Sequence, residues 1–262
     1  MKKQSILITI LFFTISAIMS CGNSGDNKET EVLPPFLIEH QAILNSQENG
    51  VEEKTIAQPK LEINGTESVS VVTIGSQVWT SKNLDVATYR NGDVIPQVQD
   101  NKAWEYLQYT STGAWCYYDN DASNGTKYGK LYNWYAVNDP RGLAPKGYHI
   151  PTETEWTKLI DYLGGDVEAG AKMRSTNGWY DDRSGTIRDV NRGTNSSGFS
   201  GLPGGGYNGF IHFTLGLDGN WWSSTEINPF FAKSFQLGAY TGIYRGDGRD
   251  KEHGFSVRCL RD

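Results

Sequence analysis

The segment GYHIPTETEWTKLIDYLGG, residues 147–165, decides the fold because it carries the clearest helix signal in the chain. Thr152 followed three positions later by Glu155 is a capping box, in which the hydroxyl accepts from a first-turn amide and the glutamate reaches back to the cap amide. Apolar residues then recur at i, i+3, i+4 and i+7, as in a core-facing stripe: Trp156, Leu159, Ile160 and Leu163. Gly164 and Gly165 end the pattern. The segment therefore predicts an amphipathic helix.

The same segment gathers His149, Glu153 and Glu155, with Asp161 further on, which raises the alternative of a metal or acid/base site. The helix dipole favours carboxylates in the first turn, so helix formation alone explains both glutamates. His149 precedes the cap and does not share a helical face with them, unlike the paired ligands of an H-E-x-x-H zinc helix. We therefore predict a structural helix start here.

Short strands surround this helix in residues 68–262, where aromatic residues and glycines are frequent enough for one sizeable domain. Gly75-Ser76 and Asn91-Gly92 are two-residue hairpin signals. The closing segment GFSVRCLRD, residues 254–262, reads as a strand with one buried face. GKLYNWYAV, residues 129–137, is the second segment with a helical pattern. The expected class is α+β, with two helices, short and mostly antiparallel strands, and long loops.

Seven ordered motifs in this region carry a family resemblance: YGKLYNWYAVND (128–139), GYHIPTETEW (147–156), LGG (163–165), AGAKMRS (169–175), SGFSGLPGG (197–205), WWSSTE (221–226) and GFSVRCLRD (254–262). Together they resemble the Fibrobacter succinogenes major paralogous domain, and IGSQVWTSKNL (74–84) and YRNGDVIP (89–96) extend the match to residues 71–262. More distantly, the motif order is similar to the formylglycine-generating enzyme group. That resemblance implies a C-type-lectin-like, or sulfatase-modifying-factor-like, domain. One departure is Ala144, where family members often carry a cysteine, so a disulfide common among relatives is expected to be missing here.

The N-terminus predicts export. Lys2 and Lys3 precede an apolar run at residues 6–19, and a small residue then precedes Cys21. This pattern is similar to a bacterial lipoprotein signal, in which residues 1–20 are removed and Cys21 carries the acyl chains, palmitate among them. Plain secretion is the alternative. No other run approaches the ~18 apolar residues of a membrane-spanning helix, so the lipid is the only membrane attachment we expect.

Residues 21–67 are expected to form a flexible tether, because they hold few aromatics and many scattered acids. The net charge of the chain is −6, and no basic patch is present to meet a phosphate backbone. Nucleic acid is therefore not an expected partner. The predicted location is the cell envelope, at the outer membrane, and the sequence leaves open whether the domain lies on the periplasmic side or is exposed on the surface.

The chain lacks the cysteine pair that the distant resemblance to formylglycine-generating enzymes would require for activity. Formylglycine-generating enzymes bind copper with two closely spaced cysteines near the C-terminus, whereas this domain has only Cys116 and Cys259. Ser223 and Ser224 have no nucleophile-elbow pattern, and the histidines at positions 40, 149, 212 and 253 are scattered. We predict that the domain is not an enzyme. An oxidase related to that group remains an alternative.

Cys116 and Cys259 are the candidate disulfide, because an exported protein meets an oxidising compartment. The bond would close a loop of about 140 residues and stabilise the fold by up to a few kcal/mol in the chain-entropy model. Two buried free thiols are the alternative.

The segment YYDNDASNG, residues 117–125, offers oxygen ligands that suggest a weak calcium candidate: Asp119, Asp121 and Asn124. The glycine falls one place late for an EF-hand, and Lys130 stands where the bidentate glutamate should be. Turns rich in Asp and Asn also form without any ion. No other cofactor is predicted.

The aromatic content, with eight tryptophans, favours a carbohydrate-binding interpretation, since exposed rings stack on sugars. The candidate ligand-binding cluster has six members: Tyr207, Asn208, His212, Asp218, Trp221 and Trp222. The alternative for the two tryptophans is core packing. Three other aromatics outside the strongest motifs are also candidates: Trp104, Tyr180 and Tyr244.

These observations lead to one expected function and two alternatives. We expect a non-catalytic cell-envelope lipoprotein whose domain recognises a glycan or a protein of the envelope or cell surface. A structural component of a surface or pilus-like assembly is the first alternative, and an enzyme is the second.

Overall fold

The computed structural model describes residues 69–181, 188–189 and 193–262. The predicted signal peptide, the tether and Cys21 lie outside these residues. Every element described below belongs to the unit Ala57–Asp262.

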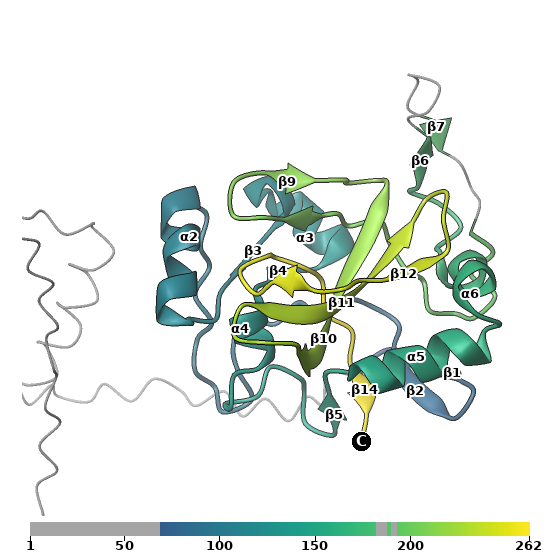
Figure 1. Ribbon diagram of the computed structural model, residues 1–262, viewed down its shortest axis with the longest axis horizontal. Helices are drawn as coiled ribbons and strands as arrows, with labels where there is room; N and C mark the ends of the chain where they lie inside the picture. The colour runs from purple at the N-terminus through teal and green to yellow at the C-terminus, as the bar shows by residue number, and fades with distance from the viewer. Residues whose placement is uncertain (1–68, 182–187, 190–192) are drawn as a thin grey trace, which may run out of the picture. The chain divides into compact units, whose positions relative to one another are not determined.

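The first sheet joins the two ends of the domain (Figure 1). Its strand order is β1-β2-β14-β5, all antiparallel, formed by Val71–Ile74, Gln77–Thr80, Leu260–Arg261 and Tyr148–His149. Gly75 adopts a φ of +60° in the predicted β1–β2 turn, which favours glycine there. The C-terminal strand is therefore held between the first hairpin and the segment that leads into the quoted helix.

The second sheet is the longest in the domain. Strands β10 (Asp218–Glu226) and β11 (Phe231–Gly238) form an antiparallel pair, and β12 (Ile243–Arg245) and β13 (Arg249–Asp250) both pair with β11. The register of β10 shifts between Trp222 and Glu226. In Figure 1, β10 and β11 run through the middle of the domain.

Helix α5, Glu153–Tyr162, confirms the prediction made from the quoted segment. Thr152 and Glu155 form both bonds of the capping box, and Trp156, Leu159 and Ile160 are buried. A second helix, α6 (Asp166–Met173), follows after the Gly164-Gly165 stop. The amphipathic stripe is thus sufficient to place this part of the chain.

The described residues contain five α-helices, where the sequence predicted two. Besides α5 and α6 there are α2 (Asn101–Thr110), α3 (Ala122–Tyr128) and α4 (Trp134–Val137), with a short 3-10 turn at Tyr118–Asn120. In the 129–137 segment only the last four residues are helical, because the Asn133 side chain accepts from Ala136 N and starts the helix late. The α+β class is confirmed.

The remaining strands are two-residue ladders between loops. They are β3 (Trp115–Cys116) with β4 (Leu131–Tyr132), β6 (Tyr180–Asp181) with β7 (Arg188–Asp189), and β8 (Gly206–Tyr207) with β9 (His212–Phe213).

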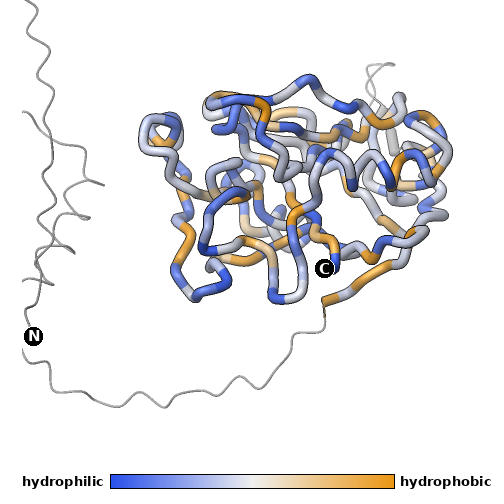
Figure 2. The backbone as a smooth tube through the Cα atoms, turned by 60° about the horizontal axis from the view of Figure 1, so that its bottom comes forward, coloured by the Kyte–Doolittle hydropathy of each residue, from blue (hydrophilic) through white to orange (hydrophobic). Residues whose placement is uncertain are grey.

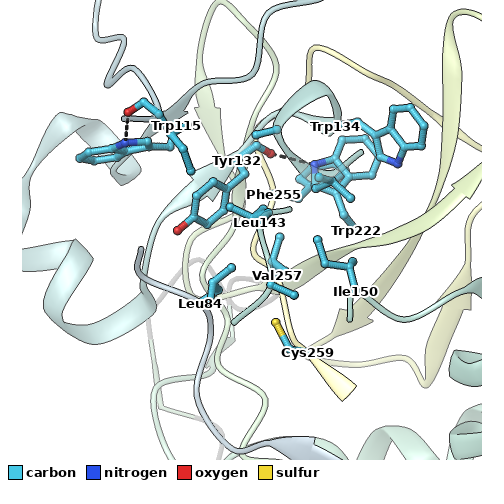
Figure 3. Close-up of a cluster of buried hydrophobic side chains, with 14 of the residues drawn as sticks. Leu84, Trp115, Tyr132, Trp134, Leu143, Ile150, Trp222, Phe255, Val257 and Cys259 are labelled. Carbon is cyan, nitrogen blue, oxygen red and sulfur yellow. Dashed lines mark hydrogen bonds between the residues drawn. The ribbon is translucent and has the colours of Figure 1, made fainter. Parts of the chain in front are cut away.

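Three clusters of buried side chains hold these elements together, and all eight tryptophans are buried. Figure 3 shows the first cluster, where Trp222 Nε1 donates to the Tyr132 carbonyl at 2.8 Å and Phe255, Val257 and Cys259 line up along the C-terminal segment. Hydrophobic and hydrophilic residues alternate over short distances along the chain (Figure 2). This alternation fits a core assembled from many short segments. The helices of the described residues include no candidate for a membrane span.

Candidate binding site

The structure contradicts the predicted ligand-binding role of Trp221 and Trp222. Both are buried, with 1% and 0% of their surface exposed, and Trp221 Nε1 donates to Asn83 Oδ1 at 2.9 Å. Because a ring must be exposed to stack on a sugar, these tryptophans belong to the core. Trp104 is also fully buried, and its Nε1 donates to the Glu252 carbonyl at 2.7 Å.

Two more members of the predicted cluster build the β8–β9 turn. Tyr207 is buried, and its hydroxyl lies 2.8 Å from Asn101 Oδ1 and 2.9 Å from the Gly209 carbonyl. Asn208 Oδ1 accepts from the backbone amides of Phe210 and Ile211. Their polar groups therefore serve the hairpin, while Asp218, at the start of β10, is partly exposed. Of the other aromatic candidates, Tyr180 is partly exposed and Tyr244 is 47% exposed.

His212 lies between Cys116 and Asp119, a proximity that the sequence did not predict. Cys116 Sγ is 3.9 Å from His212 Nε2, and His212 Nδ1 is 3.6 Å from Asp119 Oδ1. The His212 ring also stacks on Tyr207, with centroids 4.4 Å apart. Burial raises the pKa of the Cys116 thiol and lowers the pKa of His212, so neither group is activated. With 1% of Cys116 exposed, the arrangement is a packed thiol rather than a nucleophile that a substrate reaches.

The predicted disulfide between Cys116 and Cys259 is not formed. Both cysteines are free thiols and both are buried, as in the alternative. They belong to different core clusters: Cys116 packs with the α2 and β8 side chains, and Cys259 with the first cluster. Ala144 lies in the same cluster as Cys259. Burial raises the pKa of Cys259 to about 12, which keeps it a neutral thiol.

The calcium candidates have other roles in the structure. Asp121 caps α3 by accepting from Ser123 N at 2.8 Å, and Asn124 Nδ2 donates to the Tyr118 carbonyl at 3.0 Å. Asp119 faces His212. Within the described residues no group of three or more His, Cys, Asp or Glu side chains is placed to hold a metal ion.

His149, the residue that opened the question of an acid/base site, lies between two carboxylates. Its Nε2 is 2.9 Å from Glu155 Oε1, and its Nδ1 is 2.7 Å from Asp262 Oδ1. Burial alone would lower the pKa of His149, but hydrogen bonds from its ring to the carboxylates of Asp262 and Glu155 outweigh this effect and raise the pKa. The cluster fastens the C-terminus to the start of α5, at the edge of a shallow hollow of about 350 Å³. The other residues that line this hollow are Ser76, Gln77, Val78, Lys158, Leu260 and Arg261.

A larger cleft, of about 510 Å³, lies between three loops. Its walls come from the loop after β2, the end of α3 and the loop before β8, and Arg258 lies beneath its floor. The lining residues outside the floor are Ser81, Lys82, Asn83, Asp85, Gly125, Thr126, Lys127, Tyr128, Gly129, Ser200 and Leu202. This volume falls in the range of small-ligand sites.

Arg258 links the loops that form the cleft. Its Nε donates to Asn83 Oδ1 at 2.7 Å, and its Nη1 donates to the carbonyls of Thr80 and Phe199, both at 2.8 Å. Nη2 donates to the Ser200 carbonyl at 3.1 Å, and the guanidinium lies 4.5 Å from the centroid of the Phe199 ring. All four acceptors are neutral. Burial lowers the pKa of Arg258 to about 9, so the side chain is still charged at neutral pH.

Asn83 joins this guanidinium to the core, using the full capacity of its amide. Its Nδ2 donates to the Tyr128 carbonyl at 2.8 Å and to Ser256 Oγ at 3.1 Å. Its Oδ1 accepts from Trp221 Nε1 and from Arg258 Nε. Neither Asn83 nor Arg258 was predicted as a site residue, although both lie in the motifs that carry the family resemblance.

The charge in the cleft is positive although the whole chain is acidic. Lys82 and Lys127 are exposed at the rim, and Arg258 is fully buried below. Among the described lining residues the one carboxylate is that of Asp85, which accepts from Lys130 Nζ at 2.6 Å. The described lining therefore brings two exposed ammonium groups and one buried guanidinium close together.

Comparison with known protein families matches residues 72–261 to the Fibrobacter succinogenes major domain. The chain belongs to this family. No curated protein and no solved structure matches it. In this Fibrobacter succinogenes major domain, four of the segments quoted above contribute residues to the cleft: IGSQVWTSKNL, YGKLYNWYAVND, SGFSGLPGG and GFSVRCLRD. Four other lining residues lie outside these segments: Asp85, Gly125, Thr126 and Lys127. Segments far apart in the chain thus meet at one place on the surface.

Proposed function

We propose that the chain is a cell-envelope lipoprotein whose folded domain is a non-catalytic recognition module for a glycan or a protein of the envelope. The observation that carries this proposal is the cleft over Arg258, a polar hollow of ligand size on a domain built from loops. Loops held by a rigid scaffold are where binding usually resides. The buried tryptophans no longer support the proposal, so it rests on the cleft and not on aromatic stacking.

The chemistry of the lining fits binding better than catalysis. It offers hydroxyls, an amide and ammonium groups, from Ser81, Thr126, Ser200, Asn83, Lys82 and Lys127. Neither histidine nor cysteine is among the described residues that line it. The groups present suit hydrogen bonds to a polar ligand.

The envelope location and the finer fold are part of the proposal. The charged start, the apolar run and Cys21 support lipidation and outer-membrane sorting, and a tether of some 45 residues would extend roughly 35–40 Å as a coil. The α+β domain would be a variant of the C-type-lectin-like, sulfatase-modifying-factor-like fold. Its short antiparallel strands and long connections support that assignment.

A structural role in a surface assembly is the second candidate, favoured by exposed apolar side chains on two hairpin turns. Phe210 and Ile211 are 59% and 62% exposed in the β8–β9 turn, and Phe230 is 72% exposed between β10 and β11. Exposed apolar residues of this kind are common at protein contacts.

The proposal is tested by binding. Full-length protein in detergent micelles is applied to an array of envelope and extracellular polysaccharide fragments and is used to capture partners from cell envelopes. Thr126→Trp, which fills the cleft from the exposed end of α3, should abolish binding, whereas Thr110→Trp at the exposed end of α2 should not. If no glycan or envelope protein binds, or if both variants behave alike, the recognition role is rejected and the structural role is favoured.

A further inference from the structure

We propose that two aromatic hairpin turns dock the domain on the surface of a phospholipid bilayer. The Asn208 turn (residues 208–211) joins β8 to β9, and the Asn228 turn (residues 228–231) leads from β10 into β11. The inference rests on the lipid anchor of the proposed function but not on the cleft. It follows from the exposed side chains of the turns, from the pairing of their backbone groups and from the length of chain that precedes the domain.

The two turns are built in the same way, and both expose apolar side chains. In each, the asparagine Oδ1 accepts from the backbone amides two and three positions later, at 2.9–3.0 Å. The residues that donate are Phe210 and Ile211 in the first turn, 59% and 62% exposed, and Phe230 and Phe231 in the second, 72% and 38% exposed. Each turn is therefore held in a shape that leaves two adjacent apolar side chains in solvent.

The backbone groups of these four residues are all paired within the domain. Their amides donate to the two asparagines. Their carbonyls accept, at 2.9–3.2 Å, from the Asn101 side-chain amide and from the backbone amides of Asn208, Lys251 and Ile227. The four residues can thus leave water without carrying an unpaired N–H or C=O into an apolar phase, which is the condition that a lipid bilayer imposes.

The two turns lie close to one segment, residues 251–254. The Phe230 carbonyl accepts from Lys251 N, and Tyr207, which precedes the Asn208 turn, pairs with Gly254. Because Gly254 is three residues after Lys251, these two attachment points are at most about 11 Å apart. Figure 1 shows both turns on the side of the domain that carries α2, away from α5 and α6. A flat surface can therefore meet both turns at once.

The chemistry of the turns fits lipid better than a protein partner. Neither turn contains a charged residue, so the affinity for a bilayer depends on the apolar area that is buried and not on the charge of the headgroups. A protein partner would need separate pockets at the spacing of the two turns, whereas a bilayer accepts both without a matching shape. The expected surface is that of a zwitterionic phospholipid.

The chain that precedes the described residues brings the domain within reach of a bilayer. With Cys21 lipidated, the proposed tether of some 45 residues would extend roughly 35–40 Å as a coil. A folded domain of the size of residues 68–262 has a radius of gyration of about 16 Å, so a tether of this length lets any face of the domain meet the bilayer. The tether also raises the local concentration of the turns at the surface, and a few apolar side chains therefore suffice for docking.

Quenching by brominated phosphatidylcholine tests the docking, with the full-length protein reconstituted into phosphatidylcholine vesicles. The variants Phe230→Trp and Tyr162→Trp each add one indole, at positions that are 72% and 66% exposed. All eight native tryptophans are buried and give a common baseline. We expect the brominated lipid to quench the added indole of Phe230→Trp, but not that of Tyr162→Trp, which lies on α5.

Removal of the aromatic side chain from the other turn shows whether the two turns act together. In the Phe230→Trp background, Phe210→Ser should lower the ratio of docked to free domain at least about tenfold, since a large apolar side chain is lost from the interface. The matched control, Val167→Ser at a position of α6 that is 74% exposed, should leave the ratio unchanged. Raising the salt concentration should not release the turns, because they carry no charge. Circular dichroism and the melting temperature show whether each variant is folded.

Four outcomes would overturn the inference. Equal quenching of Phe230→Trp and Tyr162→Trp would show that the turns do not meet the bilayer, and release by salt would show attraction between charges instead. A blue shift of the Phe230→Trp emission that needs envelope proteins rather than lipid would assign the turns to a protein partner. Dimers that Phe210→Ser abolishes in sedimentation would assign them to a second copy of the chain.

Failure of the docking is distinguishable from failure of the proposed function. The recognition role is tested at the cleft, through Thr126→Trp and the binding of glycans or envelope proteins. Neither Thr126 nor any other residue of the cleft lies in the two turns. A domain that docks without binding a glycan or partner would keep the inference and lose the recognition role, and the reverse result would keep only the recognition role.

Discussion

Replacing Asn83 by alanine should destabilise the domain more than any other single amide truncation at its surface. The amide makes four hydrogen bonds, to Tyr128, Ser256, Trp221 and Arg258, with lengths from 2.7 to 3.1 Å. At about 0.5–1.5 kcal/mol net for each bond, the loss lies between about 2 and 6 kcal/mol. The partners are one carbonyl, one hydroxyl, one indole and one guanidinium, so a single substitution affects both the cleft and the core.

Two effects decide where in this range the loss falls. Trp221 is buried, and its Nε1 would remain without an acceptor, which raises the cost. Asn83 itself is only partly buried and lines the cleft, so water can enter and bond the Tyr128 carbonyl and Arg258, which lowers the cost. We therefore expect about 2–4 kcal/mol, with no change in overall structure.

Urea unfolding followed by circular dichroism measures this loss, and a constant m-value shows that the same surface is exposed on unfolding. For a domain of this size the melting temperature should fall by roughly 4–16 °C. The control is Asn124→Ala, which removes an amide with one bond, to the Tyr118 carbonyl, and should cost no more than about 1 kcal/mol. A loss below about 1 kcal/mol for Asn83→Ala, or equal losses for both variants, would refute the assignment of Asn83 as the link between cleft and core.

Three further predictions follow from the same structure. His149→Gln should lower the free energy of unfolding more at pH 6 than at pH 9. The pKa of His149 is raised in the folded state, so its bonds to Glu155 and Asp262 contribute fully below the unfolded pKa of about 6.5 and are lost as pH rises through the folded pKa. Equal losses at both pH values in urea titrations would contradict this. Glu226→Ala should lower the free energy of unfolding by about 1–2 kcal/mol, because it removes the carboxylate partner of the Lys251 ammonium. The Lys251 side chain is 5% exposed and that of Glu226 is 52% exposed. An unchanged melting temperature would show that the fold does not need the pair. The eight tryptophans should be poorly quenched by acrylamide in the native state and readily quenched in urea, since all are buried; strong native quenching would place at least one of them on the surface.

Local signals explain which parts of the fold were predictable. The capping box, the apolar stripe and the double glycine of α5 all lie within 19 residues, and the β1–β2 turn needs only Gly75. The Asn91-Gly92 signal was confirmed as a turn, with Gly92 at a φ of +95° and a single bridge between Thr88 and Val94. Helix α2 was missed because only Trp104 and Leu107 are buried on it, which is too weak a stripe to detect.

The error over Trp221 and Trp222 has a physical reason. Neighbouring residues in a strand point to opposite faces, so two adjacent tryptophans are both buried only when both faces of the sheet are covered. That is the case for β10: Trp222 packs in the first cluster, and Trp221 packs in the second with Trp156 of α5. Composition alone does not distinguish an aromatic ring in the core from an exposed ring that can bind a sugar. The adjacency of the two tryptophans in one strand was the available signal for burial.

The cleft was not predicted for a different reason. Its key contact joins Asn83 to Arg258, which are 175 positions apart in the sequence. Such a pairing is set by the first sheet, where β14 lies beside β2 and places the C-terminal segment under the loop that follows β2. A neutral apolar side chain would fill the floor without desolvating a charge, which is often the more stable solution for buried ionic groups. Here four hydrogen bonds to neutral acceptors offset part of the desolvation of the Arg258 guanidinium, and the same bonds join the end of β2 and the loop after it to the loop before β8.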